Sequence, residues 1–237
     1  ALEQHLERHA DVTAALIVEP LVQCASGMVM YDPEYLRLAR ALCDRYGVHL
    51  IADEIAVGCG RTGSFFAHQQ AGIRPDFLCL SKGISGGYLP LSITLTTDAV
   101  YRAFYDDSVR RGFLHSHSYT GNALACRAAL ATLDIFEQDD VIARNRTRAS
   151  LLASLCAPLA ADPRIMHLRQ RGMIVAFDVL TDDPGFARAL FAAGLERELL
   201  LRPIGNTVYF MPPYVISDEE CAILVRRTRE ALDVVLR

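Results

Sequence analysis

The stretch DFLCLSKGISGGYLPLS, residues 76–92, places a lysine where an apolar run gives way to glycines. The run Asp76–Ser81 is short and almost continuously apolar, which predicts a strand covered on both faces. Lys82 follows it directly. Its amine could simply reach water, as most lysines do. Alternatively, a partly desolvated lysine loses its proton readily and can form a Schiff base. The stretch by itself leaves both interpretations open.

Two earlier apolar runs, Ala14–Pro20 and Val48–Glu54, also predict buried strands. The segment between them predicts a helix in which Asp32 is the cap, Pro33 takes the first position and Gly47 ends the helix. The order strand, helix, strand implies a parallel sheet with right-handed crossovers. We therefore expect an α/β fold whose ligands bind at the carboxyl ends of the strands.

Asp53 and Lys82 both fall at such strand ends. A buried carboxylate is costly without a cationic partner, so Asp53 could cap a local turn or pair with Arg61. A functional interpretation is that Asp53 faces the protonated ring nitrogen of pyridoxal phosphate while Lys82 forms the Schiff base. Both requirements of that cofactor are met at neighbouring strand ends.

The glycines of GCGRTG, residues 58–63, match the G-x-G-x-x-G pattern that wraps a pyrophosphate at a helix start. The pair Asp53 and Glu54 precedes them, where a smooth passage from strand to turn is needed. No acidic residue stands about 20 positions beyond the last glycine to bind a ribose hydroxyl, and Asp76 comes too early. A nucleotide-binding domain is thus the less favoured alternative.

The pattern changes in the second half of the chain. A further strand is expected at Leu91–Thr97, and helices are expected from Gly121 and over residues 141–159. Beyond these, a β-α-β-β-α order is predicted. Its parts are the strand RGMIVAFDV, a helix over residues 184–198, two strands in LLLRPIGNTVYFMPP with a turn at Gly205-Asn206, and a last helix capped by Ser217 with Glu220. We expect a large domain with a mainly parallel sheet over residues 1–155 and a smaller α+β domain over residues 156–237.

The composition of the 237 residues, 51% hydrophobic and 22% charged, is that of a globular protein with a sizeable core. A net charge of −4 provides no basic field for nucleic acid or an anionic membrane. No apolar run approaches the roughly 18 residues needed to span a bilayer. The first residues resemble neither a secretory signal nor a start with methionine, which suggests a partial record of a longer chain.

Seven scattered cysteines without a C-x-x-C motif suggest reduced core residues of a cytoplasmic protein. His115 and His117 have only i, i+2 spacing, which is typical of a loop, so no metal site is expected.

The segments LIADEIAVGCGRTG (residues 50–63) and PDFLCLSKGISGGYLPLS (residues 75–92) together resemble the signature region of class III, or ω-type, pyridoxal phosphate aminotransferases of fold type I. The 29 residues that separate Asp53 from Lys82 also suit that family. The resemblance implies pyridoxal 5'-phosphate as cofactor, Lys82 as the catalytic Schiff-base lysine and Asp53 as the partner of the ring nitrogen.

The same resemblance implies that Ser118, with Tyr119, binds the cofactor phosphate across the interface of a homodimer, because hydroxyl and backbone N–H groups suit a dianion. An ordinary helix N-cap is the alternative for Ser118.

Substrate contacts are implied at four further positions. Arg202 matches the arginine that binds the carboxylate of the keto substrate, a task for which the planar guanidinium is suited. Tyr209 and Arg61 match positions that line the site, with packing and surface salt bridging as alternatives. Gly87 lies in the turn after the lysine, where a bulky side chain could obstruct the cofactor.

Within the family, IVEPLVQCASGMVMY, FLHSHSYTGNALAC and RPIGNTVYFMPPY most resemble the branch that acts in biotin synthesis. Relatives that act on GABA or ornithine usually carry a gating glutamate and a glutamine where this chain has LVQCASG and Ala56. The resemblance implies transfer of an amino group from S-adenosylmethionine, or lysine, to 8-amino-7-oxononanoate, which gives 7,8-diaminononanoate. Another class III ω-aminotransferase and an inactive fragment are the alternatives, since family members extend far upstream.

Overall fold

The computed structural model describes residues 1–236, which divide into two compact units. Unit 1 contains Ala1–Leu21, Tyr31–Gly60 and Ser64–Asp140, and unit 2 contains Val22–Met30, Arg61–Gly63 and Val141–Arg237. The last helix of unit 2 ends at Val235. The domain boundary expected at residues 155 and 156 falls at the end of a helix of unit 2 and stays a prediction.

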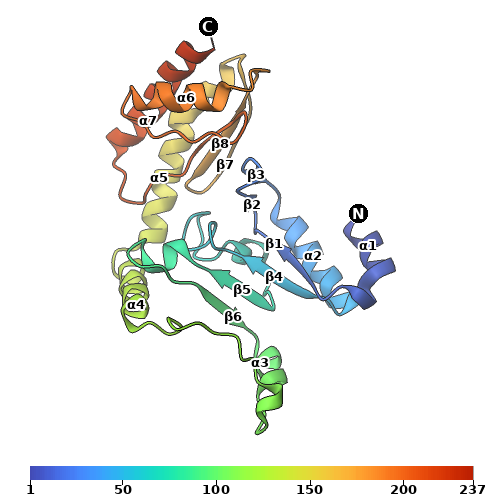
Figure 1. The fold of residues 1–237 in the computed structure, drawn as a ribbon. Helices are drawn as coiled ribbons and strands as arrows, with labels where there is room; N and C mark the ends of the chain where they lie inside the picture. The colour runs from blue at the N-terminus through green and yellow to red at the C-terminus, as the bar shows by residue number, and fades with distance from the viewer. Residues whose placement is uncertain (237) are drawn as a thin grey trace. The chain divides into compact units, whose positions relative to one another are not determined.

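Unit 1 is built on a four-stranded sheet in the order β1-β4-β5-β6 (Figure 1). The strands are β1 (Ala15–Val18), β4 (His49–Asp53), β5 (Phe77–Leu80) and β6 (Ile93–Thr96). β1, β4 and β5 run parallel, and β6 is antiparallel to β5. The mainly parallel sheet expected from the alternation of strands and helices is confirmed.

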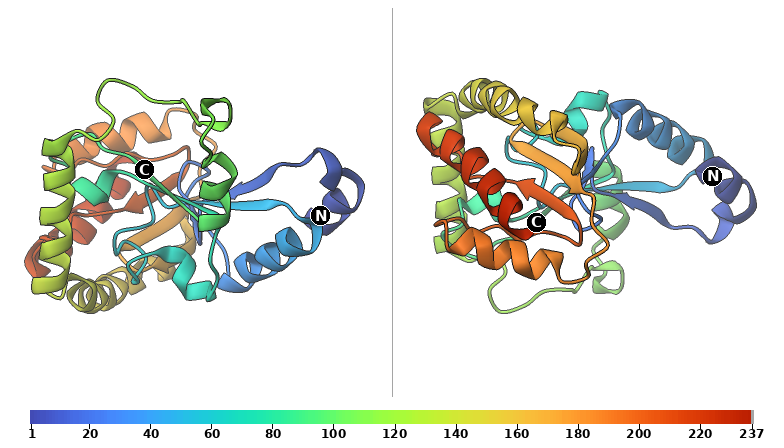
Figure 2. Two further views of the ribbon diagram at one scale, coloured as in Figure 1. Left: turned by 90° about the horizontal axis from the view of Figure 1, so that it is seen from below. Right: turned by 90° about the horizontal axis from the view of Figure 1, so that it is seen from above.

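The helix α2 (Pro33–Tyr46) has the ends that the sequence predicts. The Asp32 carboxylate accepts a hydrogen bond from the Glu34 amide at 2.8 Å, and Gly47 closes the helix with a φ of 66°. Together with α1 (Leu2–His9), α2 packs against β1 and β4, as Figures 1 and 2 show. The buried residues of this cluster are Leu6, Cys43, Val48 and Leu50.

The carboxyl end of β5 leads into the 3-10 helix η3 (Lys82–Ser85). η3 packs against α4 (Ala123–Gln138), and Ile84 of η3 and Ala129 of α4 form a buried cluster with Cys59. The remaining elements are η1 (Ala10–Val12), η2 (Ala67–Ala71), α3 (Asp98–Phe104) and η4 (Val109–Arg111).

Unit 2 is an antiparallel sheet in the order β7-β8-β9, with helices packed on it (Figures 1 and 2). The strands are β7 (Ile165–Arg171), β8 (Ile174–Val179) and β9 (Thr207–Phe210). The helices are α5 (Val141–Cys156), η5 (Ala157–Ala161), α6 (Phe186–Leu195) and α7 (Asp218–Val235). α7 begins with the predicted capping box of Ser217 and Glu220. Phe177, Phe186 and Leu190 are among the buried side chains of this α+β core.

Two strand assignments in unit 2 differ from the sequence prediction. Residues 165–171 form the unpredicted strand β7, which is paired with β8. Residues 199–203 were expected to be a strand and form none; Ile204 and Thr207 make only an isolated bridge across the predicted turn at Gly205-Asn206. β9 pairs with β8, and the sheet order is β7-β8-β9.

A short hairpin early in the chain belongs to unit 2. It consists of β2 (Val22–Gln23) and β3 (Val29–Met30), which pair antiparallel. The Arg169 guanidinium holds the hairpin, since it donates hydrogen bonds to the carbonyls of Gly27 at 2.7 Å and Met28 at 3.0 Å. The same guanidinium contacts the Asp178 carboxylate at 2.9 Å.

Four of the seven cysteines are buried, as expected for core residues, whereas Cys126 on α4 is exposed. No helix within residues 1–236 is both long and apolar enough to cross a membrane.

Candidate functional site

Asp53 and Lys82 lie at the same edge of the sheet in unit 1. Asp53 ends β4 and is in register with Cys79 of the parallel strand β5. Lys82 follows three residues after Cys79. Because neighbouring strands are about 4.8 Å apart, the parallel register brings the carboxylate and the start of the lysine turn to adjacent carboxyl ends, where open α/β sheets bind ligands.

The Asp53 carboxylate is half-buried and accepts few hydrogen bonds. Its Oδ1 atom accepts a hydrogen bond from the Ile55 amide at 3.1 Å, so the local-turn interpretation is correct for one oxygen. Within residues 1–236 it forms no ion pair. Its charge acts on Cys79, whose thiol pKa is raised by burial and further by Asp53. A half-buried carboxylate without a cation is suited to a cationic ligand.

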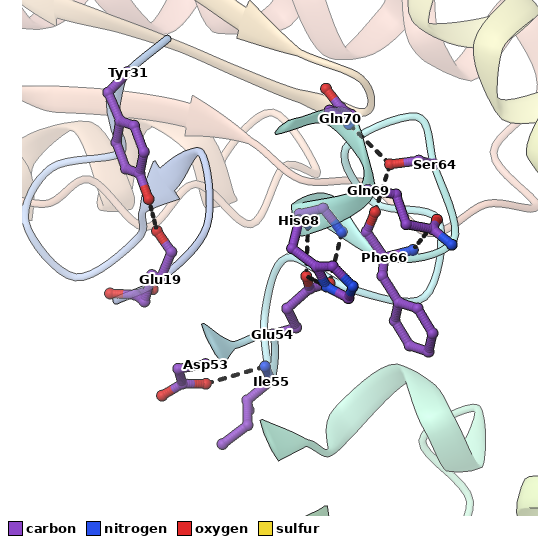
Figure 3. A network of polar contacts seen from close by, with 11 residues as sticks. Glu19, Tyr31, Asp53, Glu54, Ile55, Ser64, Phe66, His68, Gln69 and Gln70 are labelled. Carbon is purple, nitrogen blue, oxygen red and sulfur yellow. Dashed lines mark hydrogen bonds and ion pairs between the residues drawn. The ribbon is translucent and has the colours of Figure 1, made fainter. Parts of the chain in front are cut away.

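Glu54 lies beside Asp53 but serves a different purpose (Figure 3). It is 1% exposed, and its carboxylate accepts hydrogen bonds from the amides of Ala67 at 2.6 Å and His68 at 2.8 Å. The His68 Nδ1 atom is 2.7 Å from the same carboxylate. Glu54 therefore anchors η2 to the end of β4.

Lys82 has an unusual backbone conformation. Its φ is 47°, in the left-handed region that residues other than glycine rarely adopt. The chain packs closely at the next residue, because a Cβ atom on Gly83 would lie 2.9 Å from the Cβ of Cys59. Such conformations cluster at ligand-binding and active sites. Residues 1–236 leave the Lys82 side chain exposed and do not supply the partial desolvation that the sequence suggested.

The turn after Lys82 requires its glycines. Gly86 and Gly87 have φ values of 61° and 81°, and no atom lies near the position of a Cβ on Gly87. The hydroxyls of Ser81 and Ser85 donate to backbone carbonyls across the turn, at 2.8 Å and 2.6 Å. The turn is thus held at both ends while its tip stays open.

Ser118 and Tyr119 lie in an exposed turn before α4. The helix cap is Asn122, whose side chain accepts hydrogen bonds from the amides of Leu124 and Ala125, so the N-cap alternative for Ser118 is wrong. Tyr119 is 75% exposed. Both side chains are accessible to a ligand, and their proposed phosphate role stays a prediction.

Arg202, Tyr209 and Arg61 all belong to unit 2. Arg202 is exposed, lies in an irregular segment and forms no hydrogen bond or ion pair within residues 1–236. Tyr209 is half-buried on β9. Arg61 lies 4.4 Å from the centre of the Tyr214 ring and donates to the Pro212 carbonyl at 2.6 Å. Its guanidinium thus has structural contacts, as the packing alternative expects.

The GCGRTG turn does not have the context of a nucleotide-binding loop. No α-helix begins in residues 58–66, and the next helical element is the 3-10 helix η2. A Cβ atom on Gly58 would lie 2.8 Å from the Glu54 carbonyl oxygen, and the Gly60 amide donates to the Phe65 carbonyl at 3.1 Å. The turn therefore folds back on itself and offers no helix N-terminus to a phosphate.

The residues at the edge of the sheet fit pyridoxal phosphate. Asp53 provides a carboxylate that lacks a cation, and Lys82 provides an exposed primary amine on the adjacent strand end. Within the described chain, no three or more His, Cys, Asp or Glu side chains are grouped so that they could hold a metal ion. His115 and His117 lie in the irregular segment before Ser118.

Comparison with known proteins agrees with this chemistry. Residues 1–232 match the family described as aminotransferase class-III, and the chain belongs to that family. It is 48% identical over 98% of its length to the adenosylmethionine-8-amino-7-oxononanoate aminotransferase of Helicobacter pylori, and 41% identical over 99% to that of Synechococcus elongatus. It covers 55% of each of those proteins, so the chain spans about half the length of these curated relatives.

Solved structures give the same result for the fold. The adenosylmethionine-8-amino-7-oxononanoate aminotransferase of Methanocaldococcus jannaschii matches 98% of the chain with a TM-score of 0.92 at 33% identity, and 56% of that structure is covered. The ω-transaminase of Pseudomonas jessenii, as a thermostable mutant, matches 99% with a TM-score of 0.92 at 29% identity, and 54% is covered. The fold is that of the type I pyridoxal phosphate-dependent transferases.

Three residues support the site in ways that we did not predict from the sequence: Glu54, His68 and Cys59. Glu54 could have been recognised, because side chains alternate along a strand and a second acid after Asp53 must face the interior and find donors there. The contacts of His68 and Cys59 carry no local sequence signal.

Proposed function

We propose that the chain forms part of a transaminase of biotin synthesis that converts 8-amino-7-oxononanoate to 7,8-diaminononanoate, with S-adenosylmethionine or lysine as amino donor. The observation that carries this proposal is the placement of Asp53 and Lys82 at adjacent carboxyl ends of parallel strands. The names of the relatives from Helicobacter pylori and Synechococcus elongatus support the choice of substrate.

Pyridoxal phosphate, when bound, would supply an aldehyde for the amino group and a ring that withdraws electrons. The protein's part is proton placement. Asp53 holds a proton on the ring nitrogen, since a neighbouring carboxylate favours the charged form of a base. Lys82, once its amine is free, would take the proton from the substrate α-carbon and deliver it to the C4′ carbon of the cofactor.

Binding of substrate and cofactor is divided among other residues. Arg202 binds the carboxylate of the keto substrate, which suits a guanidinium that has no partner within residues 1–236. Tyr209, Gly87 and Arg61 line the substrate site. For Arg61 this requires the guanidinium to keep its contact with Tyr214 while one edge faces the substrate.

A homodimer completes the proposed site, with Ser118 and Tyr119 binding the cofactor phosphate of the second copy. Support comes from exposed aromatic side chains in the segment before these residues, where Tyr105 is 72% exposed and Phe113 is 68% exposed. Exposed apolar side chains that gather on a surface are typical of a protein interface.

A second candidate is an ω-transaminase of different substrate range. It is favoured by the match to the Pseudomonas jessenii ω-transaminase, whose TM-score equals that of the Methanocaldococcus jannaschii structure. The two candidates share Lys82 and Asp53 and differ only in substrate.

The test uses the full-length protein supplied with pyridoxal phosphate. We expect visible absorbance from the bound cofactor, its loss on borohydride treatment, and a mass label on Lys82. Lys82→Ala should abolish the borohydride-sensitive absorbance and the mass label. A screen of amino donors with 8-amino-7-oxononanoate as acceptor then tests this acceptor and identifies the donor. A colourless protein would contradict the transaminase proposal, whereas a coloured protein inactive on this acceptor would favour the second candidate.

A further inference from the structure

The most constrained polar group near the proposed site is the Glu54 carboxylate. It is buried together with His68, which is 8% exposed, and it accepts two backbone hydrogen bonds from η2 in addition to the contact with His68 Nδ1. Because the carboxylate is already the acceptor for two amides, the Nδ1 atom carries the hydrogen and donates it at 2.7 Å. Figure 3 shows this group beside Asp53.

The backbone of Glu54 is held as firmly as its side chain. Its amide donates to the Cys79 carbonyl at 3.0 Å, and its carbonyl accepts from the Gly58 amide at 2.9 Å. Asp53, by contrast, has a single hydrogen bond to its carboxylate, from Ile55. Since Asp53, the last residue of β4, and Glu54 share a peptide bond, the orientation of Asp53 depends on how Glu54 is fixed.

We infer that Glu54 and His68 form a positioning pair that directs the Asp53 carboxylate toward the ring nitrogen of the cofactor; this rests on the proposed function. His68 supplies the only side-chain donor to Glu54 within residues 1–236. A buried carboxylate short of one charge-assisted hydrogen bond is destabilised and shifts toward other donors. That shift moves the peptide between Asp53 and Glu54, and with it the direction of the Asp53 side chain.

The experiment compares two substitutions of His68 in the full-length holoenzyme. In His68→Asn the side-chain amide nitrogen takes the place of Nδ1 and still donates, whereas His68→Leu removes the donor. We expect His68→Leu to weaken cofactor binding about 10- to 100-fold, the range that corresponds to one lost hydrogen bond to a buried charged group. The 15N chemical shift of the labelled ring nitrogen of the cofactor should move toward the value of its unprotonated form. His68→Asn should remain near the wild type in both measurements.

Gln70→Leu is the matched control. It lies on the same 3-10 helix, and its side chain donates to Ser64 Oγ at 3.0 Å rather than to Glu54. The control should leave the ring-nitrogen signal unchanged. Equal shifts in Gln70→Leu and His68→Leu would overturn the inference, because they would indicate a general loss of stability.

A second variant guards against poor folding of His68→Leu. Glu54→Gln keeps the side-chain volume and one acceptor oxygen but removes the charge, and it should shift the same ring-nitrogen signal. An unchanged ring-nitrogen signal in folded His68→Leu or in folded Glu54→Gln would overturn the positioning role. Failure of the wild type to bind the cofactor at all would instead contradict the proposed function, so the two failures are distinguishable.

Discussion

The loop after β4 supports both residues of the proposed site through two unrelated contacts. Glu54 begins the loop and anchors the strand end that carries Asp53. Cys59, with a φ of 51°, packs directly against Gly83, the residue after Lys82. The glycines that flank Cys59 resemble a phosphate loop in sequence, but in the fold they let the chain approach Glu54 and the lysine turn closely.

We expect Gly83→Ala to destabilise the protein by about 1 to 3 kcal/mol, the usual cost of overpacking. The new Cβ would lie 2.9 Å from the Cβ of Cys59, and Gly83 does not have a left-handed backbone that would add its own strain. Urea unfolding measures the change. Adding Cys59→Gly should recover much of the loss because it removes the opposing atom. Independent, additive effects of the two substitutions would contradict this contact.

Arg202→Gln should raise KM for the keto substrate about 10- to 100-fold with little change in kcat. The reason is that a charge-assisted pair with a carboxylate is worth roughly 1.5 to 3 kcal/mol and acts equally on ground and transition states. Steady-state kinetics on the full-length enzyme test this expectation. Arg226→Gln is the control, since Arg226 is an exposed arginine paired with Glu230 on α7. A fall in kcat without a change in KM would exclude the binding role.

At the scale of elements, helix ends were predictable and strand partners were not. Asp32, Gly47 and Ser217 act through neighbours within four residues, so their roles follow from the local sequence. β7, with the sequence IMHLRQR, alternates poorly and contains a bulge between Met166 and Arg169. Its strand conformation depends on pairing with β8, which local pattern does not show.

The hairpin of β2 and β3 should depend on Arg169. Arg169→Lys can keep the charge but not the guanidinium contacts to the carbonyls of Gly27 and Met28. We expect amide hydrogen exchange at Gln23 and Val29 to accelerate about tenfold or more, as expected for loss of one or two hydrogen bonds. Arg226→Lys should leave these amides unchanged. Protection equal to wild type in the Arg169 variant would show that the strand pairing alone holds the hairpin.

At acidic pH the free energy of unfolding should depend on the charge of Asp162, which lies between the end of η5 and β7. Hydrogen bonds from Arg164 lower the pKa of this carboxyl from 3.8 to about 2. Folding therefore favours its charged form, and this stability is present above about pH 4 and is lost as the pH falls toward 2. Asp162→Asn should make the free energy of unfolding less dependent on pH in this range.

The effect of Asp162→Asn should be at most about 1 kcal/mol, because the pair with Arg164 is screened by solvent. Urea unfolding at pH 5 and pH 3 measures it, with Asp134→Asn as the control for a surface carboxylate whose contact with Arg127 is 3.6 Å long. An identical pH dependence in the wild type and the Asp162 variant would refute the assignment.

At the scale of the whole molecule, unit 1 exposes aromatic side chains that a second copy could cover. Tyr101 and Tyr105 stack at 5.5 Å between ring centres, and Phe104 and Phe113 lie 5.6 Å apart. We expect Phe104→Ser with Phe113→Ser to shift the full-length protein from dimer to monomer in sedimentation velocity. Val215→Ser removes a more exposed apolar side chain from unit 2 and should have no such effect. A monomeric wild type would contradict the dimer.

The sequence was sufficient to place Asp53 and Lys82 together, because parallel strand order determines where their ends meet. It was not sufficient for the strand status of the Arg202 segment, since three leucines before Pro203 satisfy a strand pattern without providing a partner. Nor could it show that the hairpin of β2 and β3 belongs with unit 2, because the contacts of Arg169 span 141 and 142 residues of chain.

Those spans have a consequence for biogenesis. The ribosome completes the hairpin long before it adds Arg169, and at roughly 5 to 20 residues per second the delay is about 7 to 30 s. During that interval the carbonyls of Gly27 and Met28 cannot form their hydrogen bonds with Arg169. Co-translational folding must therefore leave the hairpin without these contacts until residue 169 has been added, and a ribosome that pauses before that residue would prolong this state.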